Sequence, residues 1–125
     1  MMRKKEIQFQ MINDKDETNF TTTGTFDQNK LSFLDHEKQK NSILFKENSV
    51  EYIKTGNRYM NYVFDQKSIT KGVYRIDQFE LHFQIYTTYI KKSDEFVKIH
   101  FTLQQDDEVV GHHQLIILFK DAEEE

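Results

Sequence analysis

The sequence predicts an all-β protein. Apolar and polar residues alternate with a period of two along most of the chain, no segment carries the long apolar stripe of a helix, and turn-forming residues recur at short intervals. At 125 residues the chain fits one domain, and no segment resembles an interdomain linker. We expect about eight to ten short antiparallel strands, closed as an up-and-down barrel or stacked as a sandwich.

The strands of the N-terminal half are marked by apolar residues two positions apart. They fall around residues 7–11, 20–26, 31–33 and 43–45. Clusters of Asp, Asn, Lys and Gln separate them at 13–16, 27–29, 35–41 and 46–48, as expected for tight turns.

A central hairpin is predicted over the stretch VEYIKTGNRYMNYVFD, residues 50–65. Gly56-Asn57 suits a two-residue turn of the primed type. That turn would place Tyr52 opposite Asn61 and Lys54 opposite Tyr59, and both faces of the hairpin would then be mixed. A barrel with a partly polar interior would need such a mixed face.

The C-terminal half repeats the alternation around residues 80–85, 97–103 and 113–119. A three-residue turn at 91–93 would place Phe83 beside Phe101 on one face and His82 near His100 on the other. The last residues, 119–125, are expected to form an acidic tail. The predicted core comprises Phe9, Phe20, Leu81, Phe83, Ile99, Phe101, Leu115 and Ile117.

Composition excludes several classes of function. The chain has no cysteine, which rules out disulfides, Cys-ligated zinc and thiol catalysis. A net charge of −4 with both signs dispersed argues against a nucleic-acid binder. The N-terminal residues alternate in polarity, unlike a signal peptide, and no run is long enough to span a membrane. We therefore expect a cytoplasmic protein.

Four stretches in order resemble the YwiB-like family of small bacterial proteins of unknown function. They are TTTGTFDQNKLSFLD, NSVEYIKTGNRYMNYVF, GVYRIDQFELHFQIYTTYI and GHHQLIILF. The resemblance implies a calycin-like β-barrel related to the lipocalins. The family's hairpin tip tends to carry an arginine, one further residue and a glycine, where this chain has Lys54-Thr55-Gly56. It supplies no catalytic residues.

No catalytic constellation is found, so we expect no enzyme and no cofactor. The four glycines are isolated, which excludes a phosphate loop, and no serine lies in a nucleophile elbow. His82 and His100 could hold a metal with Glu80, but exposed surface histidines are the favoured interpretation and no metal site is predicted. His113 shares parity with Leu115 and is expected to face inward, near a barrel mouth.

Two functions stay open. In the first, the barrel binds a small apolar or anionic amphipathic ligand, with Lys54, Tyr52, Tyr59 and His113 as candidate contacts. Lys54 would then pair with the ligand's carboxylate near the mouth, although it can equally be a rim lysine that solubilises the turn. In the second, the barrel is filled, and exposed tyrosines serve a protein partner or a homodimer. The tyrosines considered for that surface are Tyr62, Tyr86 and Tyr89.

Overall fold

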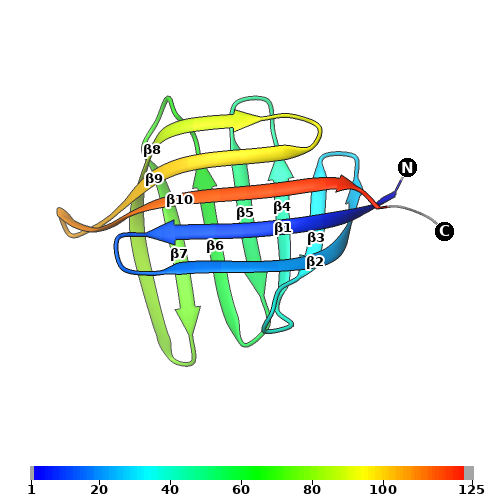
Figure 1. Ribbon diagram of the computed structural model, residues 1–125. Helices are drawn as coiled ribbons and strands as arrows, with labels where there is room; N and C mark the ends of the chain where they lie inside the picture. The colour runs from blue at the N-terminus through cyan, green and yellow to red at the C-terminus, as the bar shows by residue number, and fades with distance from the viewer. Residues whose placement is uncertain (1, 123–125) are drawn as a thin grey trace.

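Ten antiparallel strands close into one barrel (Figure 1). The structure is a computed structural model that describes residues 2–122. Each strand pairs with its neighbours in the sequence, and the first pairs with the last, so the predicted all-β, up-and-down barrel is confirmed. The strands are β1 (Arg3–Asn13), β2 (Glu17–Asp27), β3 (Lys30–Leu34), β4 (Lys40–Phe45), β5 (Val50–Thr55), β6 (Arg58–Phe64), β7 (Thr70–Ile76), β8 (Phe79–Lys92), β9 (Phe96–Gln105) and β10 (Glu108–Asp121).

The barrel is flattened into two layers that cross at a steep angle (Figure 1). The second half of β8 lies with β9, β10, β1 and β2 in the front layer, and β3 to β7 form the back layer. β8 joins the layers at one corner, because its first half pairs with β7 and its second half with β9. β2 joins them at the other corner, where only Gly24–Asp27 pair with β3.

Most of the predicted core is buried. Among the eight predicted residues, Phe20 is only partly buried and Leu81 is 40% exposed, so the assignment of Leu81 was wrong. Leu81 lies two residues from Phe83, so alternation alone would turn it inward as well. However, β9 ends at Gln105, and the start of β8 extends beyond that end with β7 as its only strand partner. The alternation of apolar and polar residues does not show where a strand extends beyond its neighbour.

The predicted register of the central hairpin was wrong by one residue. Lys54 lies opposite Met60 and Tyr52 opposite Tyr62. The turn is longer because Gly56 has a φ of 141° and packs against the side chain of Gln39 from the neighbouring loop. The inner face pairs Tyr52 with Tyr62, whereas the outer face stays mixed, with Glu51 opposite Val63. Tyr62, proposed above as an exposed contact, is therefore buried.

The β8–β9 hairpin confirms the shared inner face but not the turn. Phe83 and Phe101 are both buried in the interior. Lys92 lies opposite Val97, so the turn is longer than predicted, and a bulge at Thr88 restores the parity. His82 and His100 are not neighbours, because His82 lies opposite Val73 of β7.

The C-terminal strand is longer than the sequence suggested. Phe119, placed above where the last strand meets the acidic tail, is buried, and β10 continues to Asp121. Residues 123–125 of the predicted tail lie outside the described residues. Within residues 2–122, no helix has the length and apolar character needed to cross a membrane.

Candidate functional site

A polar network closes the lower end of the barrel in Figure 1, where the loop between β3 and β4 begins. Its centre is the carboxylate of Asp35, whose side chain is 2% exposed. Oδ1 accepts hydrogen bonds from the backbone N–H groups of Glu37 (2.9 Å) and Gln39 (3.0 Å), and Oδ2 accepts one from Asn41 Nδ2 (3.1 Å). The Tyr52 hydroxyl donates to Asn41 Oδ1.

Lys54 joins this network. Its Nζ lies 3.5 Å from Asp35 Oδ2, and its side chain is 23% exposed. Burial acts to raise the pKa of Asp35, but the hydrogen bonds from Asn41, Gln39 and Glu37 and the charge of Lys54 together lower it. The inward-facing lysine therefore already has a carboxylate partner within the chain.

Tyr52 is brought together with Lys54, as the sequence predicted, but its hydroxyl is committed to Asn41. Burial raises the pKa of Tyr52, and the charge of Asp35 adds to the effect. The side chains of Asp35, Asn41 and Tyr52 are hydrogen-bonded to one another or to the loop backbone, so the network stabilises the loop.

Tyr59 does not belong to this site. The corrected register turns it to the outer face, where the guanidinium of Arg75 lies 5.2 Å from the centre of its ring. Sequence reasoning placed it beside Lys54 only because it assumed the shorter turn.

His113 faces inward, but in a different cluster. Its ring stacks on Phe101 with centroids 5.0 Å apart. Burial lowers the pKa of His113, an effect that the charge of Asp14 opposes. His113 therefore packs between Phe101 and a polar hollow that Asn13 and Asp14 also line, and no hydrogen bond or ion pair joins it to Lys54 or Tyr52.

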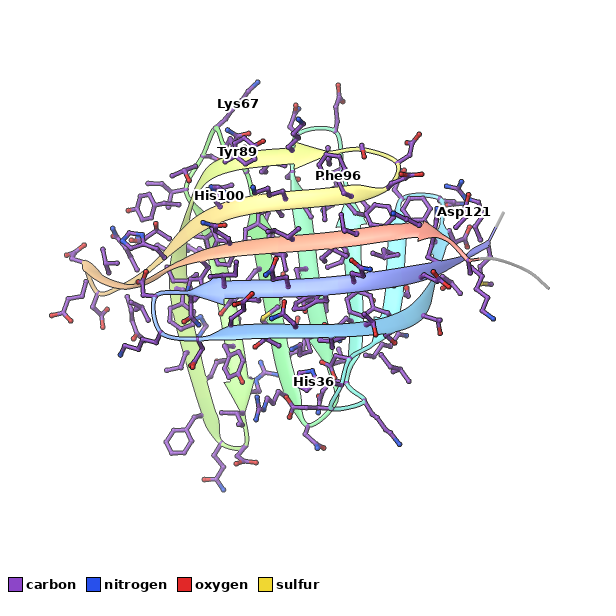
Figure 2. The ribbon with its side chains drawn as sticks, in the orientation of Figure 1. His36, Lys67, Tyr89, Phe96, His100 and Asp121 are labelled. Atoms are coloured by element: carbon purple, nitrogen blue, oxygen red, sulfur yellow. The ribbon has the colours of Figure 1, made fainter. Side chains whose placement is uncertain are left out.

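The two histidines considered above as metal ligands do not lie opposite each other. His82 and His100 lie on different parts of the outer surface, and His100 packs against Tyr89 (Figure 2). Glu80 pairs with His82 (3.2 Å) and with Arg75 (2.6 Å). Among residues 2–122, no three acidic or histidine side chains form a group that could hold a metal ion.

Aromatic rings gather in the interior in three clusters. The first packs against Tyr52, the second lies around Phe119, and the third surrounds Phe101. Their members are Phe9, Phe20, Phe33 and Tyr52; Phe26, Phe45 and Phe119; and Tyr62, Phe64, Phe83, Phe101 and His113. Neighbouring centroids lie between 4.6 and 6.4 Å apart, the range of direct ring contact.

The outer surface, by contrast, is hollowed. A cavity of about 420 Å³ lies over β10, β1 and β2, and its lining includes Gln8, Gln10, Asn19, Ile116 and Leu118. A second hollow of about 550 Å³ continues along β1 and β2, and both share Gln8 and Thr21. These hollows lie beside residues 17–23 of β2, which pair with β1 but not with β3.

Sequence reasoning missed both the Asp35 network and this surface. One signal for the network was present, because Asn41 has the parity of Ile43 and should have been placed inward with it. The one-sided part of β2 had no sequence signal, since alternation looks the same in edge and central strands.

Comparisons with known proteins agree with the fold. The chain finds no match among curated proteins. Among solved structures it is similar to the YwiB protein from Bacillus subtilis, with a TM-score of 0.65 and 20% identity over 98% of this chain and 92% of that one. This likeness confirms the fold expected from the YwiB-like resemblance. Residues 4–117 match the family described as a domain of unknown function, DUF1934, and the chain belongs to that family.

Proposed function

We propose that this protein is a non-enzymatic interaction domain with a filled barrel, which acts through its outer surface. The observation that carries the proposal is the packing of the interior. Three ring clusters pack within it, and the side chains of Tyr52, Phe64 and Phe119 are at most 1% exposed.

The charges inside the barrel support the same proposal. Lys54 is compensated by Asp35 at one end, and Lys5 at the other end pairs with Asp121 at 2.8 Å. An anionic ligand would have to displace Asp35 from Lys54 and also separate packed aromatic rings. The ligand-binding alternative from the sequence therefore has less support than the interaction alternative.

The test is whether the folded protein takes up an amphipathic anion. We expect no saturable binding of an anilinonaphthalene sulfonate or of a fatty acid, measured by fluorescence and calorimetry. Lys54→Met should leave this result unchanged, as should Lys40→Met on the exposed start of β4, which serves as the matched control. Native mass spectrometry of protein from its own host should show no bound small molecule.

Two results would contradict this expectation. A stoichiometric ligand in the native spectrum would overturn the filled-barrel proposal. So would probe binding to the folded protein that Lys54→Met weakens about 5- to 150-fold while Lys40→Met does not.

A further inference from the structure

One stretch of the barrel wall has a strand on one side only. Residues 17–23 of β2 pair with β1, whereas β3 pairs only with Gly24–Asp27. Within residues 2–122, no backbone hydrogen bond joins residues 17–23 to any segment other than β1. In Figure 1 no strand lies along the lower edge of β2 over this stretch, and the nearest cover is the β3–β4 loop, whose His36 ring lies 5.1 Å from that of Phe20.

The edge lacks three of the features that usually prevent strand addition. Natural proteins protect open edges with proline, lysine or a bulge. The stretch ETNFTTT has none of the three, and its threonines and Phe20 favour the extended conformation. Alternate N–H and C=O groups along it are therefore available to a further strand.

The surroundings of the edge favour a single extended segment over a second barrel. In Figure 1 the β5–β6 and β7–β8 turns of the back layer project below β2. A second copy that paired edge to edge would bring its own projecting turns into the same space. A single added strand carries no such turns.

The projecting part of the back layer also offers apolar contacts. Phe79 and Leu81 have the inward parity of Phe83 but lie past the covered part of the barrel, and they are 72% and 40% exposed. An added strand would point alternate side chains toward this ledge, defined as Phe79 and Leu81. Its other side chains would extend the outer face beside Asn19 and Thr21.

We propose that the free edge of β2 binds an extended segment of a partner protein in antiparallel pairing, with apolar side chains at alternate positions facing the ledge. This inference rests on the proposed function and names its surface and the kind of partner. The acidic residues Asp16 and Glu17 lie at one end of the edge, so a basic residue at the C-terminal end of the segment is preferred.

The probe is a synthetic peptide of alternating leucine and threonine that ends in lysine. We expect it to shift the amide resonances of residues 17–23 and to slow the exchange of alternate amides there. The same peptide with alternate backbone nitrogens methylated should lose binding, because it keeps the side chains but cannot complete the hydrogen-bond ladder. Leu81→Thr should weaken binding of the unmodified peptide by about tenfold.

Two proline variants test the edge from the protein's side. Of Thr21→Pro and Thr22→Pro, one removes an N–H that faces β1 and the other removes one that faces the open side. The variant that keeps the wild-type melting temperature should be the one that loses peptide binding directly. If neither variant folds, the methylated peptide still decides the question.

Three outcomes would overturn the proposal. They are resonance shifts confined to other strands, equal binding of the methylated peptide, and a dimer in sedimentation whose protected amides are those of residues 17–23. The first two outcomes would show that the edge of β2 does not bind the peptide by strand pairing, and the third would show that it binds a second copy of the chain. None of these outcomes depends on whether the interior binds an anion, so failure of the edge is distinguishable from failure of the filled-barrel proposal.

Discussion

At the scale of single residues, Asp35 determines how the lower end of the barrel closes. It accepts hydrogen bonds from two backbone amides and from Asn41, and it compensates Lys54. Asp35→Asn keeps the shape of the side chain, but its NH2 group then faces N–H groups that are themselves hydrogen-bond donors. We expect a loss of about 2 kcal/mol in the free energy of unfolding, measured in urea at neutral pH.

The same variant tests how the stability that Asp35 contributes depends on pH. The folded-state pKa of Asp35 lies below its ordinary value of 3.8, so ionised Asp35 stabilises the fold above that pH. This stabilisation is lost as the pH falls through the folded pKa. The difference between wild type and Asp35→Asn should therefore be full at neutral pH and shrink below about pH 4. Glu37→Gln, at an exposed neighbour, serves as the control, and an equal difference at pH 3 and pH 7 would contradict the assignment.

The sequence placed Lys54 on the same face as Tyr52, but it left open whether that face lines the interior and gave Lys54 no partner. Its inward direction follows from parity with Tyr52, which local alternation reveals. Its contact with Asp35 crosses from β5 to the loop after β3, and the shape of that loop depends on backbone hydrogen bonds to Asp35 itself. A single sequence carries no comparable signal for a contact of this kind.

At the scale of elements, Gly24 marks the corner where β2 passes from the front layer to the back. A Cβ at this position would overlap the carbonyl oxygen of Ser32 and the side chains of Ile7 and Phe33. Gly24→Ala should cost about 1–3 kcal/mol in urea unfolding, because both the backbone and the core would have to shift. Thr23→Ala, one residue away and exposed, should change stability by less than about 0.5 kcal/mol. Equal effects would mean that the corner tolerates a side chain.

Strand positions were predictable at this scale, whereas strand registers were not. Alternation placed strands near their observed positions because one face of each strand is buried. The registers depend on the Gln39 contact at Gly56 and on the bulge at Thr88, and both are set by other segments of the chain. The open edge of β2 belongs to the same category, since it exists only because the neighbouring β3 is short.

At the scale of the whole molecule, the barrel closes where the first strand meets the last. Lys5 on β1 is 2% exposed, and its Nζ lies 2.8 Å from Asp121 on β10. The same ammonium lies 5.9 Å from the ring centres of Phe26 and Phe119. One buried cation thus links the closing pair of strands to an interior ring cluster.

Removing one partner should therefore be worse than removing both. Asp121→Asn leaves the buried ammonium of Lys5 with aromatic contacts but no carboxylate, so the melting temperature should fall, although water around Asp121, which is 71% exposed, reduces the effect. Lys5→Met added to that variant removes the charge and keeps most of the apolar bulk, so stability should recover. Asp107→Asn, in the β9–β10 turn, is the control for loss of a surface carboxylate and should leave the melting temperature unchanged. Additive losses in the double variant would show that the two side chains act independently and that closure depends on backbone pairing alone.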